Sequence, residues 1–101
     1  MEKRRPHYPL TLVQQLAADM AHIRFTRVAI EGAVGLGLGT AGIRAVLLTL
    51  RPQDFYKSMT TYGDTAIWQD VYRPVRNGVP LYVKLTVYAA ENLLVVSFKR
   101  R

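Results

Sequence analysis

Two hydrophobic periodicities divide the chain. In the first half, apolar residues recur every three or four positions, as in Leu12, Val13, Leu16, Ala17 and Met20, and again in Ile43, Val46, Leu47 and Leu50. This spacing places apolar side chains along one face of a helix. After residue 64 the period becomes two, which is typical of strands with one buried face. The first half is therefore expected to be helical and the second half to form a sheet.

Local signals predict the ends of three helices. Thr11 with Gln14 three residues later has the spacing of a capping box and predicts the start of the first helix. Thr26 predicts the start of a second helix, which ends at Gly35, and Pro52 terminates the third. Each helix has one apolar face that must be buried against another layer.

The apolar face of the predicted sheet carries alternate residues of two strands: Leu81, Val83, Leu85 and Val87, then Leu94, Val96 and Phe98. Intervening residues such as Tyr82, Lys84, Val95 and Lys99 form the other face. Residues 77–78, Asn-Gly, favour a positive-φ turn, residues 91–92 are expected to turn the last hairpin, and residues 56–62 to form a further strand. We predict an α+β fold in one domain, residues 1–101, with three N-terminal helices packed on one face of an antiparallel sheet formed mainly by the C-terminal half.

The charge is strongly positive, with 14 Lys and Arg against 7 Asp and Glu, a formal net charge of +7. This balance predicts a polyanionic partner, and nucleic acid is favoured because neutralised phosphates release counterions. An acidic protein or a membrane surface would also match the charge.

Other classes are excluded by composition. The chain has no cysteine and 2 histidines, so a disulfide framework and a thiolate zinc site are excluded, and no metal or cofactor is expected. No signal-peptide region and no membrane-length apolar run appears, so we expect a soluble, cytoplasmic protein without a membrane partner. The string GLGTAG at residues 37–42 matches a dinucleotide-binding fingerprint, but no strand precedes it, and a glycine-rich helix connection is the better interpretation.

Residues 54–74, DFYKSMTTYGDTAIWQDVYRP, concentrate aromatic and polar side chains. Trp68, Asp70 and Tyr72 share one parity, so burying that face would bury a carboxylate that needs a partner. Gln69 shares the other parity with Arg73, and Pro74 requires an edge or a bulge. A polar sheet face carrying Lys, Tyr, Gln and Arg suits base stacking and phosphate contacts, whereas the alternative is a plain solvated face.

The same stretch resembles the MqsR family of toxins from bacterial toxin-antitoxin pairs. The strings that carry the resemblance are MEKR with His7, DFYKSMTTY, IWQDVYRP, LYVKLTV and VSFK, and they span nearly the whole chain. The resemblance implies a RelE-like fold and a ribosome-independent, metal-free endoribonuclease that cleaves single-stranded mRNA at GCU-type sites. It also implies a cognate antitoxin as protein partner.

The resemblance implies catalytic roles for Lys57, Gln69 and Tyr82, and substrate contacts for Tyr56, Met59, Arg73 and Lys99. Lys84, on the polar face, is added as a phosphate contact. His7, near a basic segment, is a candidate for phosphate contact or proton transfer, and its alternative is a frayed terminus. At two positions where relatives have histidine, this chain has Thr65 and Tyr88.

The residue types fit RNA cleavage without a metal. The 2′-hydroxyl can act as nucleophile, so the protein must deprotonate it, stabilise the phosphorane and protonate the leaving oxygen. A lysine among other cations can have a lowered pKa and serve as base or acid, and the identity of the base stays open. The alternatives are a non-catalytic nucleic-acid-binding or regulatory module and a subunit that binds only an acidic protein.

Overall fold

The computed structural model describes all 101 residues. In chain order the elements are β1 (Glu2–Lys3), α1 (Leu10–Ala17), η1 (Met20–His22), β2 (Ile23–Phe25), α2 (Arg27–Val34), α3 (Thr40–Thr49), η2 (Pro52–Asp54), β3 (Phe55–Thr60), β4 (Trp68–Tyr72), β5 (Val75–Arg76), β6 (Val79–Tyr88) and β7 (Asn92–Arg100). Three α-helices lie in the first half and the long strands in the second, so the α+β prediction is confirmed.

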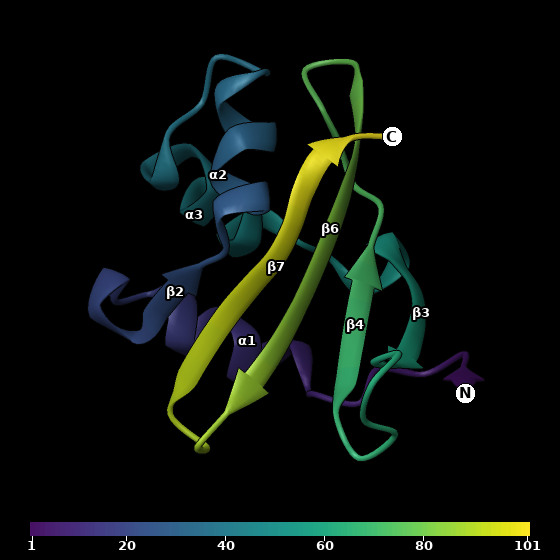
Figure 1. Cartoon of the computed structure of the whole chain (residues 1–101). Coiled ribbons are helices and arrows are strands. Elements are labelled where there is room, and N and C mark those ends of the chain that lie inside the picture. The colour runs from purple at the N-terminus through teal and green to yellow at the C-terminus, as the bar shows by residue number, and fades with distance from the viewer.

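The sheet has the order β1-β3-β4-β6-β7-β2, with β5 paired to β6 outside this path (Figure 1). All pairs are antiparallel except β2 with β7. The N-terminal half therefore supplies both edge strands, which the sequence analysis did not predict. Each has only two or three residues, too few for a period of two to be recognised.

The predicted start of the first helix is wrong. α1 begins after Pro9 and has no side-chain cap. The Gln14 carboxamide, expected to complete a capping box, instead donates to the carbonyls of Leu47, Leu48 and Leu50 at 3.3, 3.2 and 2.8 Å. Carbonyls at a helix C-terminus lack intrahelical partners, and here a side chain from α1 satisfies those of α3. Met20 lies beyond α1, in η1.

The second helix follows its prediction. Thr26 Oγ1 accepts a hydrogen bond from the Ala29 amide at 3.0 Å, and α2 ends at Gly35. α2 packs so closely on β7 that a Cβ on Gly32 would lie 1.8 Å from the Phe98 carbonyl oxygen. Glycine is thus required here by the close approach of helix and strand.

One core lies between the helices and one face of the sheet. Its 17 buried residues come from all three helices, from Leu50 directly after α3, and from β2, β4, β6 and β7, and include Val13, Ala29, Ile43, Val83, Leu93, Val95 and Phe98. We call the sheet face turned to this core the inner face, and the opposite face the outer face.

The predicted alternation in the last strand is correct only at its end. β7 buries Leu93, Val95 and Phe98, not Leu94 and Val96. Lys84 pairs with Ser97 and Leu85 with Val95, so Val96 is an additional residue in β7. This bulge reverses the alternation along the strand, because one inserted residue shifts every preceding side chain to the other face.

Two turns differ in how well they were predicted. Asn77 (φ 52°) and Gly78 (φ 78°) form the expected positive-φ turn between β5 and β6. In the last hairpin the positive φ angles belong to Ala89 (52°) and Ala90 (58°), and Asn92 already starts β7. The turn therefore lies two residues before the predicted position, residues 91–92.

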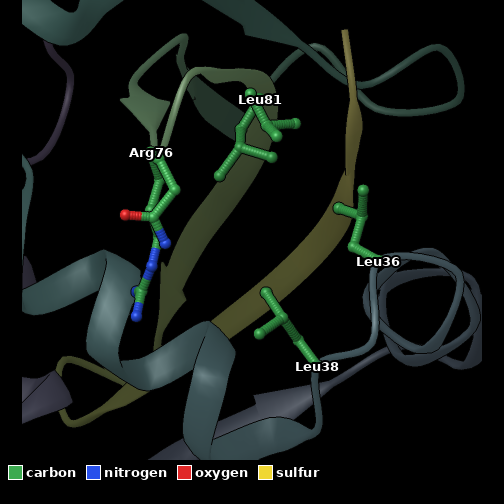
Figure 2. A pocket seen from close by; sticks show the side chains of 6 residues that line it. Leu36, Leu38, Arg76 and Leu81 are labelled. Atoms are coloured by element: carbon green, nitrogen blue, oxygen red, sulfur yellow. The ribbon is translucent and has the colours of Figure 1, made fainter.

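Residues 35–39 connect α2 to α3, with Gly37 at φ 75°, and the rest of the glycine-rich string, residues 40–42, forms the first turn of α3. Leu36 and Leu38 of this connection, with Arg76 and Leu81 of the β5–β6 region, line a small hollow of about 110 Å³ (Figure 2). None of the predicted site residues lines this hollow. No helix of the chain has the length and apolar character needed to cross a membrane.

Candidate active site

The outer face brings most of the predicted site residues together in three rows that cross the strands. Paired residues form the rows Glu2, Met59 and Gln69; then Lys57, Val71, Lys84 and Ser97; then Tyr82 and Lys99. Directly opposed residues in antiparallel strands have Cβ atoms roughly 4.5–5.5 Å apart, so neighbours in a row are in contact range. Lys99 lies beside Tyr82, as the sequence predicted.

A bulge in β3 presents Tyr56. Phe55 pairs with Tyr72 and Lys57 with Val71, which leaves Tyr56 without a partner in the ladder. Pro74, for which an edge or a bulge was expected, follows the end of β4 at Tyr72, and the bulge lies in the neighbouring strand β3. The Tyr56 ring has the Arg73 guanidinium carbon 4.4 Å from its centroid and the Lys57 ammonium at 5.5 Å. These distances are typical of cation–π contacts.

A second aromatic ring is also flanked by cations. Lys99 Nζ lies 5.2 Å and Lys84 Nζ 5.9 Å from the Tyr82 ring centroid. With the Arg4 guanidinium carbon, 5.9 Å from the Tyr56 centroid, five cationic side chains thus surround the two tyrosines. Aromatic planes interleaved with positive charge are suited to a single-stranded nucleic acid, whose bases stack while its phosphates are neutralised.

Lys57 is paired with an acidic residue. Its Nζ donates to Glu2 Oε2 at 2.7 Å. The hydrogen bond and negative charge of Glu2 raise the pKa of Lys57, and Lys57 in turn lowers the pKa of Glu2. The expectation of a lowered lysine pKa among cations is therefore corrected. With a raised pKa, Lys57 is an ammonium ion at neutral pH, suited to stabilising negative charge or donating a proton.

Glu2 was not predicted from the sequence to be part of the site. Its position depends on β1 pairing with β3, where Glu2 opposes Met59, more than fifty residues away in the chain. A strand of two residues is too short to be predicted from the local sequence.

Val71 holds two of the lysines in place. It belongs to the outer face, yet none of its surface is exposed. Lys57 and Lys84 oppose it from the strands on either side. A valine on this face without exposed surface must be covered by its neighbours, and lysine stems commonly cover apolar surface in this way while their ammonium groups stay in water. Packing therefore restricts both lysine stems.

The Gln69 carboxamide forms no hydrogen bond within the chain. In the hydrogen bonds that involve side chains, Gln69 takes part only through its backbone carbonyl, which accepts from Ser58 Oγ at 3.4 Å. This contrasts with Gln14, whose carboxamide is engaged by backbone carbonyls. A half-buried carboxamide with two donors and an acceptor at the surface can recognise a ligand.

His7 lies away from the outer-face cluster. Its ring stacks on Trp68 with centroids 5.3 Å apart, and Trp68 has the parity opposite to Gln69. Lys3 Nζ lies 2.8 Å from His7 Nδ1 and 4.2 Å from the Trp68 centroid. Burial, followed by the charge of Lys3, lowers the pKa of His7. The ring is packed, not frayed, but the structure does not bring it to the other candidates.

The buried carboxylate of Asp70 has the partners that the sequence argument required. It accepts hydrogen bonds from the backbone amides of His7 at 3.0 Å and Tyr8 at 2.9 Å. Asp70 therefore anchors the N-terminal segment on the inner face of β4. No group of three or more His, Asp or Glu side chains is placed to hold a metal ion.

The fold and the outer face define a small α+β domain with a cationic, aromatic surface suited to a nucleic-acid strand. Residues 5–100 match the family described as "Motility quorum-sensing regulator, toxin of MqsA". The chain is also similar to the protein named "mRNA interferase toxin MqsR" from Escherichia coli (strain K12), with 46% identity over 101 residues that cover the whole of both chains. The chain belongs to the MqsR toxin family.

Proposed function

We propose that the protein is a toxin-type endoribonuclease that cleaves single-stranded mRNA. The observation that carries the proposal is the outer-face cluster, in which Lys57 and Tyr82 lie among further cations and an unpartnered Gln69 lies in the row next to that of Lys57. Membership of the family and the name of the E. coli relative support the same activity.

The proposed reaction is an internal transfer. A base removes the proton of a 2′-hydroxyl, the 2′-oxygen forms a bond to the adjacent phosphorus, and the bond from phosphorus to the 5′-oxygen breaks. The 5′-oxygen takes a proton and leaves as a 5′-hydroxyl, while the other fragment keeps a 2′,3′-cyclic phosphate. The nucleophile comes from the substrate, so the protein has to supply charge, proton transfer and positioning.

The geometry suggests roles for individual residues. Lys57, an ammonium ion whose pKa is raised further by Glu2, would stabilise the phosphorane or protonate the leaving oxygen. Tyr82, between Lys84 and Lys99, would orient the phosphate or take part in proton transfer. Arg73 and Tyr56 extend the surface along the strand, where they would contact the RNA backbone and a base.

Several finer properties belong to the same proposal. They are independence of metal and ribosome, cleavage at GCU-type sites, action in the cytoplasm and neutralisation by a cognate antitoxin. An acidic antitoxin would complement the net charge of +7 and associate rapidly with the toxin. The RelE-like arrangement implied by the resemblance also stays a prediction.

The test is incubation of the purified chain with a defined mRNA, without ribosomes and in the presence of EDTA. We expect cleavage within unpaired regions and fragments that end in 2′,3′-cyclic phosphate and 5′-hydroxyl. Binding without cleavage would favour a non-catalytic module, and loss of activity in EDTA or a 5′-phosphate product would contradict the proposed reaction. Stoichiometric antitoxin should abolish cleavage.

A further inference from the structure

The largest of the three surface hollows lies where β4 and β6 separate. The pairing of these strands ends at Asp70 and Leu85, and beyond it the β3–β4 loop and the β6–β7 hairpin diverge (Figure 1). The hollow has a volume of about 420 Å³, against about 110 and 280 Å³ for the other two. Ligand sites in proteins typically have about 300–1,000 Å³.

The walls of this hollow are mainly apolar and aromatic. Ile67 from the loop and Tyr88 from the end of β6 contribute to them, with 43% and 42% of their surfaces exposed. Tyr8 reaches the hollow from the N-terminal segment, and its hydroxyl lies 3.1 Å from the Trp68 carbonyl and 3.0 Å from Thr86 Oγ1. Tyr8 therefore bridges the separating strands and forms part of the wall of the hollow between them.

Gln69 connects the hollow to the outer face. It lines the hollow and also belongs to the row of Glu2 and Met59, next to the row that contains Lys57. Residues two apart on one strand are about 6.6–6.8 Å apart, so Gln69 lies within one such step of Val71 and the lysines that flank it. Its free carboxamide is a polar group available at a mainly apolar hollow.

We propose that this hollow is a nucleobase subsite, and the proposal rests on the proposed function. An unstacked base would pack its ring against Tyr88 and Ile67, and the Gln69 carboxamide would pair with a donor and an acceptor on the base edge. The adjacent phosphate would lie over Lys57 and Lys84. Base selection at the hollow is thereby separated from bond cleavage at the lysines.

The experiment measures binding, so that it does not depend on cleavage. Single strands that contain a GCU triplet are 2′-O-methylated to block attack by the 2′-oxygen, and each position in turn is made abasic. Affinities are measured for the wild-type chain and for Ala66→Trp, which places a ring at the wall of the hollow, and Tyr88→Ala. Ala45→Trp, which fills a different hollow at α3, is the matched control.

For the wild type we expect one abasic position to reduce affinity about 5- to 150-fold, the loss for one stacked base. Ala66→Trp and Tyr88→Ala should bind the intact strand more weakly and should lose most of the penalty at that position. Ala45→Trp should behave as the wild type. Ala66 and Tyr88 are both exposed in the structure, so the fold should tolerate their replacement.

Two results would overturn the subsite. One is an abasic penalty that is the same in wild type, Ala66→Trp and Tyr88→Ala at every position. The other is a control, Ala45→Trp, that changes affinity and abasic penalty as much as Ala66→Trp does. Cleavage of the unmodified strand by the wild type is measured in parallel. If the wild type cleaves RNA but the abasic penalty is the same in the wild type and in both variants, the subsite is rejected and the endoribonuclease is kept. If one abasic position weakens binding and the variants remove this penalty, but no RNA is cleaved, the subsite is kept and the endoribonuclease is rejected.

Discussion

Replacement of Lys57 separates its charge from its packing. Lys57→Met keeps an unbranched stem over Val71 and removes the ammonium group, whereas Lys57→Ala removes both. If Lys57 acts through its charge, the two variants should lose the same activity and differ in stability. The control is Lys3→Met, which removes the same charge from the neighbouring strand, on the inner face beside Trp68.

The expected magnitudes follow from the surroundings of the side chain. Removal of one group that stabilises transition-state charge lowers kcat about 100- to 1,000-fold. Complete burial of a valine contributes about 1.5–3 kcal/mol, and Lys57→Ala uncovers only one side of Val71, so its unfolding free energy should fall by less than about 1.5 kcal/mol. Lys57→Met should stay close to the wild type, because its stem still covers the valine.

The assays are single-turnover cleavage of a short RNA and urea unfolding, both on the same preparations. We expect strongly reduced cleavage in both Lys57 variants, nearly wild-type cleavage in Lys3→Met, and a lowered urea midpoint only in Lys57→Ala. A Lys57→Met protein that cleaves at the wild-type rate would refute a role for the charge. Unfolding of both variants would show that Lys57 is needed for the fold and would withdraw its assignment to the site.

Further predictions concern the ion pair, the helix contact and the substrate. Glu2→Gln removes the partner that raises the pKa of Lys57, so the NMR titration midpoint of the Lys57 side chain and any alkaline loss of cleavage should both move to lower pH; an unchanged midpoint would contradict the pairing. Gly32→Ala should lower the free energy of unfolding, measured in urea, by about 1–3 kcal/mol, because α2 must move away from β7. Gly35→Ala, at φ −60° with its nearest contact at 3.5 Å, should be neutral or stabilising by up to about 1 kcal/mol, and equal effects would argue against the close approach. Arg73→Ala should weaken RNA binding and flatten its dependence on salt, and a slope equal to that of the wild type would remove Arg73 from the phosphate contacts. A target triplet placed once in a loop and once in a stem of one transcript should be cut only in the loop, and equal cutting would contradict recognition of unstacked bases.

Bulges explain why the strand faces were only partly predictable. Alternation identified β6 correctly, and it placed Tyr82, Lys84 and Lys99 on one face. It failed in the first part of β7, where the additional Val96 exchanges the two faces. The residue that forms a bulge depends on how two strands pair over their whole length, and no local pattern in either strand encodes it.

The N-terminal segment shows the same limit in the candidate site. The basic neighbours of His7 made it a candidate for phosphate contact or proton transfer, with a frayed terminus as the alternative. The buried Asp70 instead binds the backbone of this segment and holds the histidine against Trp68. The same segment pairs β1 with β3 and places Glu2 on Lys57. Each of these contacts joins residues more than fifty positions apart.

The sequence by itself determined the features that depend on neighbouring residues: the helical and extended halves, the cap at Thr26, the turn at Asn77 and Gly78, and the type of chemistry available to a lysine- and tyrosine-rich strand pair. These follow from backbone sterics, side-chain hydrogen bonds to nearby amides and the two hydrophobic periods. Only the tertiary structure decided which face each residue joins, that Glu2 pairs with Lys57 and raises its pKa, and that Gln69 lines a hollow between separating strands. The reason is that strand register and edge pairing are set by burial and hydrogen bonding summed over distant segments, and a change of one residue in register moves a side chain from the core to the surface.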